Sequence, residues 1–249
     1  MRRQIIGSGL SDNTVVWECP SCNRESRRFA SLPRYAAPMT APPTLTTGGT
    51  AEVRRYIALL STLGFRLRPD ERWLPDELAM VAEALADLLR VARWSPEVCA
   101  NALGGPITLL RDHSGPITTD AAGTRYPILG LYDANRRLLT VNDWSFDARV
   151  GGVTNGRRVL LHELAHAWDR RAAYRLSLGI TLLPGPRASG YARVSRFEDW
   201  AEAVMGAVYG AEPGHESFDR TAAGYPSPRL RYTRWAFARY RRRGDKRSR

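Results

Sequence analysis

The sequence predicts an α+β fold in which a small sheet packs with several helices. Three observations support this prediction: helical spacing of apolar residues between 51 and 103, short apolar runs with turn residues between 107 and 141, and two further helical segments at 155–173 and 195–209. The 249 residues are 43% hydrophobic and 25% charged, a composition typical of a globular protein with one sizeable core.

Three helices are expected before the sheet, over residues 51–65, 75–93 and 95–104. In the second helix, Pro75 suits the first turn, and Asp76 and Glu77 complement the positive end of the helix dipole. The Ser-Pro-Glu sequence from Ser95 opens the third helix, and Gly104 stops it. The first half of the domain is therefore predicted to be helical.

The second half of the domain contains the predicted strands, followed by two helices. Residues 128–132 and 137–141 flank the sequence Asp-Ala-Asn-Arg at 133–136, which has the composition of a tight turn and therefore predicts a hairpin. The remaining elements are a strand over 107–111, a helix over 155–173 with Thr154 or Asn155 as N-cap, a loop rich in Pro and Gly over 177–194, and a helix from Ser195 to Tyr209.

The chain divides into three predicted segments. Residues 31–50 contain four prolines, two glycines and five threonines, which is the composition of a linker. They close an N-terminal region, 1–50, which precedes the main domain at 51–219. A basic C-terminal segment, 220–249, carries 11 arginine and lysine residues and one acidic residue, so its net charge is +10, whereas the rest of the chain has a net charge of +2.

The basic segment allows three interpretations. Arginine offers a two-pronged donor to phosphates and carboxylates, so the segment is a candidate for binding nucleic acid or another polyanion, with aromatic side chains between the arginines to stack on bases. Alternatively, Trp235, Phe237 and Tyr240 fit the apolar face of a final helix that docks on the core. A solvated end without a partner is the third interpretation.

Several classes of protein are excluded or disfavoured. No run of 18 apolar residues exists, which excludes a membrane-spanning helix. The first three residues, Met-Arg-Arg, are not followed by the apolar stretch of a secretory signal, and three cysteines cannot form a disulfide framework. We therefore expect a cytoplasmic protein without a membrane partner, while export by another route stays open.

The most informative motif lies in the predicted helix 155–173, where His162, Glu163 and His166 form the pattern His-Glu-x-x-His. Histidines four residues apart lie on one face of a helix, so both reach a single zinc ion, Zn²⁺. Glu163 is close enough to take a proton from a metal-activated water without binding the metal itself. Chance gives this pattern in a chain of this composition only about 0.003 times.

A catalytic zinc site needs a third protein ligand. The best candidates are Glu198 and Glu202, which lie four residues apart on the helix from Ser195, so that one binds the metal while the other accepts a hydrogen bond from a ligating histidine. Ser195 and Glu198 also fit a capping box, which is a purely structural alternative for Glu198. We favour Glu198 as the ligand, with Glu202 as the fallback, over His113 and His215.

These motifs, with the sequence Gly-Tyr-Ala-Arg at 190–193, resemble the catalytic domain of anthrax lethal factor and its bacterial relatives, a family of zincin metallopeptidases of the gluzincin type. The resemblance implies a zincin-like fold in which His162, His166 and Glu198 bind zinc and Glu163 is the general base. It also implies that Tyr191, seven residues before Glu198, hydrogen-bonds the oxyanion.

The resemblance covers residues 105–210, in which the predicted hairpin would be the edge that aligns the substrate. The two metal-binding helices are closer together in the chain than in that family, and no targeting domain is recognisable, so toxin activity and substrate are not implied. The function expected is that of a zinc-dependent endopeptidase acting on a protein or peptide substrate.

Two other functions remain open. The first is an HExxH protease that acts on DNA-associated proteins or regulators, which would use the basic segment to bind DNA. The second is a module without catalytic activity, in which the basic segment binds nucleic acid or a protein partner and the HExxH helix is structural.

A second metal site is the weakest of the predictions. Cys19 and Cys22 form one CxxC knuckle of the kind found in zinc ribbons, but a ribbon needs two knuckles and the remaining cysteine is Cys99. One alternative is a site that combines these three cysteines with His113, but the apolar neighbours of Cys99 favour a place in the core. We therefore favour a half-ribbon that pairs in a dimer, or a degenerate one.

Overall fold

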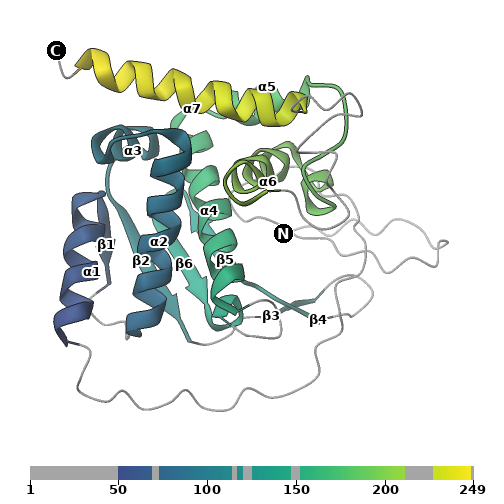
Figure 1. Cartoon of the computed structure of the whole chain (residues 1–249). Helices are drawn as coiled ribbons and strands as arrows, with labels where there is room; N and C mark the ends of the chain where they lie inside the picture. The colour runs from purple at the N-terminus through teal and green to yellow at the C-terminus, as the bar shows by residue number, and fades with distance from the viewer. Residues whose placement is uncertain are drawn as a thin grey trace.

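A computed structural model describes residues 50–68, 73–113, 117–119, 125–146, 152–210 and 227–247 (Figure 1). The elements in chain order are α1 (Thr50–Thr62), β1 (Phe65–Leu67), α2 (Pro75–Ala92), α3 (Pro96–Leu103), β2 (Ile107–Asp112), β3 (Ile117–Thr119), β4 (Arg125–Pro127), β5 (Gly130–Asp133), β6 (Leu138–Asn142), the 3-10 helix η2 (Asp143–Phe146), α4 (Gly152–Arg171), α5 (Arg175–Thr181), the 3-10 helix η4 (Tyr191–Arg193), α6 (Arg196–Tyr209) and α7 (Pro228–Arg247).

The main sheet has four strands in the order β1-β2-β6-β5. β1, β2 and β6 run parallel, and β5 pairs antiparallel with β6 through the predicted hairpin, so that Gly130 lies opposite Val141. Strands β3 and β4 form a separate antiparallel pair. β5 is thus an edge strand of the main sheet, and it contacts α4, as does its neighbour β6.

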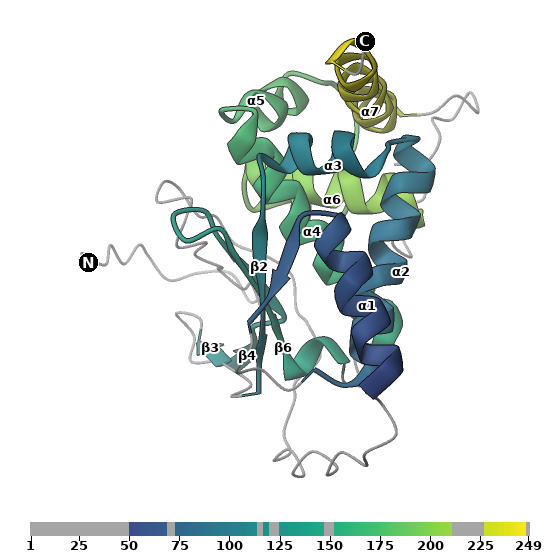
Figure 2. The ribbon, with the colours of Figure 1, turned by 90° about the vertical axis from the view of Figure 1, so that its left-hand side faces the viewer.

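Helices α1, α2 and α4 lie on one face of the sheet (Figure 2). The apolar face of α4 supplies Leu160, Leu161 and Leu164 to the hydrophobic core that also contains Leu109 of β2 and Leu139 of β6. All five side chains are fully or almost fully buried. The burial of this face holds α4 rigidly. The opposite face of α4 carries the histidines of the HExxH motif.

The α+β architecture predicted from the sequence is present: a small mixed sheet with helices packed against it. Helices α2, α3 and α6 begin and end within a residue or two of the predicted bounds. α4 begins at Gly152, before the predicted N-cap, Thr154 or Asn155. The hairpin and β2 also occupy the predicted positions.

The predicted and observed secondary structures differ at short elements. The helix expected over 51–65 ends at Thr62, and the chain then turns through Gly64, whose φ is +83°, into strand β1. The loop expected over 177–194 contains the end of α5 and the 3-10 helix η4. These elements have only three to seven residues, too few to show a periodicity in the sequence.

The basic C-terminal segment contributes a helix that docks on the core, as one of the three interpretations expected. Leu230 and Phe237 of α7 are buried, and the Trp94 Nε1–H donates a hydrogen bond of 2.9 Å to the Phe237 carbonyl oxygen. The Trp168 and Phe237 rings are stacked with their centroids 5.6 Å apart. Trp235, by contrast, is 44% exposed on the outer side of the helix.

Several predictions fall outside the described residues. They concern the N-terminal CxxC knuckle, the linker at 31–49 and His215. The domain boundaries near 50 and 219 therefore stay predictions. Within the parts of the chain that are described, no helix combines the length and the apolar character that a membrane crossing requires.

Candidate metal centre

The candidate site lies between α4 and α6, which pack against each other (Figure 1). The Trp200 Nε1–H of α6 donates a 3.1 Å hydrogen bond to the Ala165 carbonyl oxygen of α4, and the Trp168 and Trp200 rings meet edge to face. This contact sets the two helices in register, so that the acidic side chains of α6 face the histidines of α4.

The three side chains predicted as ligands converge. Glu198 Oε2 lies 2.7 Å from His162 Nε2 and 3.4 Å from His166 Nε2, and the two Nε2 atoms are 3.1 Å apart. These donor atoms could hold one metal ion. Ligands of a tetrahedral zinc are separated by about 3.3 Å when each lies about 2.0–2.1 Å from the metal, so two of the three separations already match such a site.

Glu202 occupies a different position from Glu198. Its Oε1 lies 2.7 Å from Nδ1 of His162, on the opposite side of the ring from Glu198. A carboxylate there accepts the Nδ1 proton and leaves Nε2 free to bind a metal, which is the arrangement that orients histidine ligands in metalloproteins. The two carboxylates of α6 thus reach the two nitrogens of one imidazole.

Local chain chemistry explains why Glu198 reaches the histidines. Ser195 is the N-cap of α6, and its hydroxyl oxygen accepts hydrogen bonds from the backbone N–H groups of Phe197 and Glu198. The Glu198 carboxylate points to the histidines instead of back to the cap, and it is only 3% exposed. The serine therefore caps the helix alone, and the capping box considered from the sequence does not account for Glu198.

The electrostatics of the cluster follow from its burial. Burial by itself lowers the pKa of both histidines, but hydrogen bonds and charges from Glu198 and Glu202 outweigh it and raise the pKa of His162 well above its ordinary value. Glu198 likewise raises the pKa of His166. Burial raises the pKa of Glu198, yet the charges and hydrogen bonds of the two histidines prevail and hold that pKa well below its usual range.

The two remaining predicted residues also lie at this cluster. The Tyr191 ring, in η4, has its centroid 5.7 Å from that of His162. Glu163 is almost buried and lies against the start of β5, where a Cβ on Gly130 would come within 3.1 Å of Glu163 Cγ and 2.6 Å of Val159 Cγ1. The absence of a side chain at Gly130 therefore lets the edge strand approach Glu163 closely.

Other candidates are placed elsewhere. Cys99 is fully buried in the core, where burial raises the pKa of its thiol to about 12, and His113 Nδ1 lies 3.1 Å from Asp143 Oδ1. The cysteine thus has the core position favoured from the sequence. Asp169, three residues after His166, accepts hydrogen bonds from the backbone N–H groups of Leu176 and Ser177 through Oδ1 at the start of α5.

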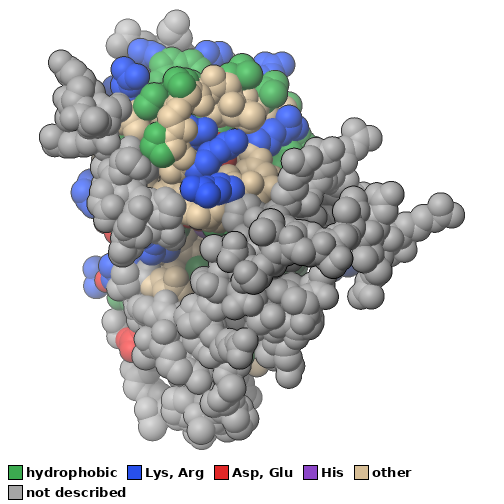
Figure 3. All heavy atoms as spheres, turned by 90° about the vertical axis from the view of Figure 1, so that its right-hand side faces the viewer, with side chains coloured by type: hydrophobic (Ala, Val, Ile, Leu, Met, Phe, Trp, Pro, Cys, Tyr) green, Lys and Arg blue, Asp and Glu red, His purple; other side chains and the backbone are tan. Residues whose placement is uncertain are grey.

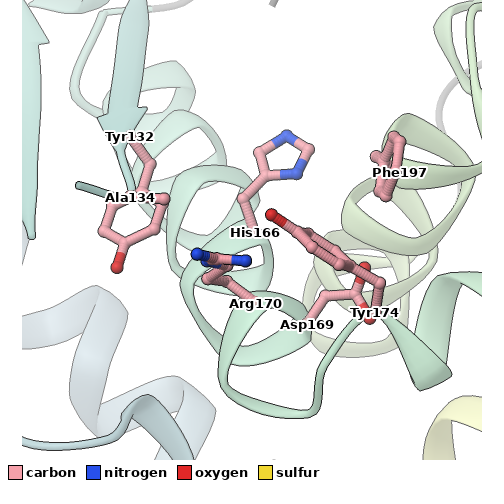
Figure 4. Close-up of a pocket in the computed structure, with 7 residues that line it drawn as sticks. All are labelled: Tyr132, Ala134, His166, Asp169, Arg170, Tyr174 and Phe197. Atoms are coloured by element: carbon pink, nitrogen blue, oxygen red, sulfur yellow. The ribbon is translucent and has the colours of Figure 1, made fainter. Parts of the chain in front are cut away.

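A small pocket beside His166 was not anticipated from the sequence (Figure 4). It is lined by Tyr132, Ala134, His166, Asp169, Arg170, Tyr174 and Phe197. Arg170 follows His166 by four residues, so the helical spacing that relates His162 to His166 already places Arg170 on the histidine face. No such signal exists for Tyr174, whose position depends on the turn between α4 and α5.

Comparisons with known proteins add little to this geometry. No protein-family model matches the sequence, and no curated protein matches it. A solved structure from Bacteroides caccae ATCC 43185, provisionally described as a zinc-binding metallo-peptidase, matches with a TM-score of 0.40 and 16% sequence identity over 78% of this chain and 85% of that one. A similarity this low supports no functional assignment.

Proposed function

We propose that this protein is a zinc-dependent endopeptidase with the metal held by His162, His166 and Glu198. The observation that carries the proposal is the convergence of two histidine Nε2 atoms and one carboxylate oxygen, with Glu202 on the far nitrogen of His162. A buried site with three such protein ligands is the pattern of catalytic zinc, which keeps a fourth position for water.

Each nearby side chain has a role in this proposal. Zinc bound at such a site activates a water molecule and polarises the carbonyl of the scissile peptide bond. Glu163 accepts the proton of the attacking water and then delivers it to the leaving amine, so it cycles between carboxylate and acid. The Tyr191 hydroxyl donates a hydrogen bond to the oxyanion that forms at the attacked carbonyl.

The edge strand supports a peptide as the substrate class. β5 pairs with β6 and is the last strand in the order of the main sheet. Glu163 of α4 lies directly against Gly130 at the beginning of this strand. An extended peptide that adds to such an edge forms backbone hydrogen bonds along it. Its carbonyls would then pass over the face of α4 that carries the histidines.

The finer classification is part of the proposal. The antiparallel edge strand, the HExxH helix and the glutamate on the next long helix are consistent with a zincin-like domain of the lethal factor type. The position of Tyr191 beside His162, seven residues before Glu198, supports the same classification.

The second candidate function is the binding of nucleic acid by α7. It is favoured by the stacked rings of Tyr232 and Trp235, whose centroids are 5.4 Å apart, and by the Arg239 guanidinium 5.2 Å from the Trp235 centroid. Trp235 is exposed next to Arg239 and is therefore suited to stacking on a base, whereas Tyr232 is half-buried. Binding of a labelled single-stranded oligonucleotide that falls steeply with salt and weakens in Trp235→Ala supports this candidate, and no binding at low salt contradicts it.

Replacing the proposed general base tests the enzymatic proposal. We expect Glu163→Gln to keep its zinc and to lower the turnover of a cleaved peptide by about 100- to 10,000-fold, because the amide cannot accept a proton. A mixed peptide library digested by the zinc-loaded protein and read by mass spectrometry identifies the peptide. Glu97→Gln, an exposed change on α3, is the matched control. Full activity in Glu163→Gln would contradict the proposed mechanism.

A further inference from the structure

Arginine and aromatic side chains alternate from one wall of the pocket beside His166, formed by Arg170, Tyr174 and Phe197, to Arg196 outside the pocket. The Arg170 guanidinium carbon lies 5.3 Å from the centroid of the Tyr174 ring, and that ring meets the Phe197 ring edge to face at 5.4 Å. The Arg196 guanidinium carbon lies 4.8 Å from the Phe197 centroid at the far end of the same row. We refer to these four residues as the arginine–aromatic row.

Both arginines of this row keep their hydrogen-bonding capacity. Neither Arg170 nor Arg196 has a carboxylate partner among the residues that the structure describes. A guanidinium lying on a ring face leaves its planar edge, with its N–H donors, free to meet a carboxylate. Figure 3 shows arginine side chains gathered on the face that lies to the right in Figure 1.

The acidic groups around the pocket are buried or bonded within their own turns. The Asp169 Oδ1 atom caps α5, whereas its Oδ2 atom is buried and has no hydrogen-bond partner among the described residues. Burial raises the pKa of this carboxyl group despite its hydrogen bonds to Ser177. Asp133 accepts the backbone N–H groups of Asn135 and Arg136 within its own turn. Arg170 is also close enough to Tyr132 to lower the pKa of that phenol, against the larger effect of burial. The accessible charge at the pocket is therefore positive.

The turn that carries Tyr174 is strained. Ala173 and Tyr174 both have positive φ angles, 54° and 59°, in a region that side chains other than glycine rarely adopt. Two such residues in succession are energetically unfavourable and persist only where the surrounding structure demands them. Here the conformation points the Tyr174 ring between Arg170 and Phe197, into the pocket (Figure 4).

We infer that this pocket is a substrate subsite that binds a carboxylate, either the side chain of an aspartate or glutamate near the scissile bond or the C-terminal carboxylate of a short peptide. Arg170 supplies the charge, and the Tyr174 and Phe197 rings form the walls. His166 lines the same pocket, so a carboxylate bound there is within a residue or two of the attacked peptide bond. This inference rests on the proposed peptidase function.

Matched peptide pairs test the inference and separate the two sources of the carboxylate. One pair differs by glutamate or glutamine next to the cleaved bond, and the other by a free or amidated C-terminus. In the wild-type protein we expect the acidic member of one pair to have the higher kcat/KM, by about tenfold to hundredfold, the range for a hydrogen bond to a charged group. Arg170→Gln should bring that ratio close to one.

Arg171→Gln is the control, because Arg171 is the next residue on α4 and its side chain packs over Gly104 instead of the pocket. It should keep the wild-type ratio. Equal kcat/KM within both pairs, a preference for the neutral member, or a preference that survives Arg170→Gln would overturn the inference.

A direct binding measurement tests the subsite independently of catalysis. The same peptide pairs, labelled with a fluorophore, are titrated with the wild-type protein and with Glu163→Gln, and binding is followed by anisotropy. Tighter binding of the acidic peptide that depends on Arg170 supports the subsite even if nothing is cleaved, in which case only the peptidase proposal fails. Cleavage without any preference in binding or rate leaves the peptidase proposal intact and removes the subsite.

Discussion

At the scale of single residues, the site depends on which imidazole nitrogen each carboxylate reaches. Glu198 reaches Nε2 of both histidines, whereas Glu202 reaches only Nδ1 of His162. The i,i+4 spacing of the two glutamates indicates that one binds the metal and the other accepts a hydrogen bond from a histidine ligand. The spacing alone does not determine which glutamate has which role. That assignment needs the packing of α6 on α4, because both glutamates lie on one face of α6 and the position of α6 along its own axis decides which of the two turns faces Nε2.

Tyr191 leads to a prediction about rate at this scale. We expect Tyr191→Phe to keep zinc and to lower kcat/KM by about 100-fold, because the ring still packs on His162 while the hydrogen bond to the oxyanion is lost. Steady-state kinetics on the cleaved peptide, with zinc content determined in parallel, measures this effect. Unchanged kcat/KM would show that Tyr191 is only a packing residue.

Residue-level prediction from the sequence is successful where spacing along one element decides the geometry. His162, Glu163 and His166 lie on one helix, so their proximity follows from helical geometry alone. Tyr174 lies in a turn with positive φ angles, and its ring contacts Phe197 of α6. No local sequence pattern predicts how this turn is placed relative to α6.

At the scale of elements, α6 and α7 are joined by a buried ion pair. Arg229 Nε lies 3.0 Å and 3.1 Å from the two carboxylate oxygens of Asp199, which also pairs with Arg187. Arg229 donates further hydrogen bonds to the carbonyl oxygens of residues 184–186, the loop before η4. The first turn of the third-ligand helix is thereby fixed to the last helix of the described chain.

Removing the Arg229 side chain should destabilise the folded protein. We expect Arg229→Met to reduce the free energy of unfolding by about 3–5 kcal/mol, because Asp199 is left buried with only one partner. Burial already raises the pKa of Asp199, and a raised folded pKa destabilises as pH rises through it, so the loss should be larger at pH 8 than at pH 5. Urea denaturation measures both effects. Arg231→Met, an exposed change on the same helix, is the control, and an equal loss there would contradict this account.

Prediction of the elements succeeds for long periodic segments and for turn chemistry. α2 and α6 show apolar residues at helical spacing, and the hairpin follows from the turn composition at 133–136. β1 and α5 are short, and they are stabilised by neighbours distant in the chain, namely β2 for the strand and α6 for the helix. Such contacts between distant parts of the chain cannot be predicted from local sequence.

At the scale of the whole molecule, the cluster between α4 and α6 links stability to pH. Without metal, the pKa of His162 lies well above its ordinary value of 6.5, so its contribution to stability is complete below about pH 6.5 and is lost as pH rises through the folded pKa. The pKa of Glu198 lies below its ordinary value of 4.5, so its contribution is present above about pH 4.5 and is lost as pH falls through the folded pKa.

The metal-free protein should therefore be most stable in mildly acidic solution and lose stability in alkaline solution. Zinc requires neutral imidazoles, so the stabilisation by zinc should increase over the same rise in pH. Thermal unfolding from pH 5 to 9, with and without zinc, measures both trends. His162→Gln should remove most of the alkaline loss in the metal-free protein, and a wild-type protein whose stability rises above pH 7 without metal would contradict the account.

The zinc content of the purified protein, determined by elemental analysis, tests the central claim most directly. We expect one zinc per chain in the wild type and in Glu202→Gln, where the site keeps all three ligands although zinc binds about 10- to 100-fold more weakly. We expect loss of that zinc in Glu198→Ala, purified in the same way. Wild-type protein without zinc after purification in the absence of chelator, or zinc retained in full by Glu198→Ala, would contradict the claim that His162, His166 and Glu198 form a metal centre.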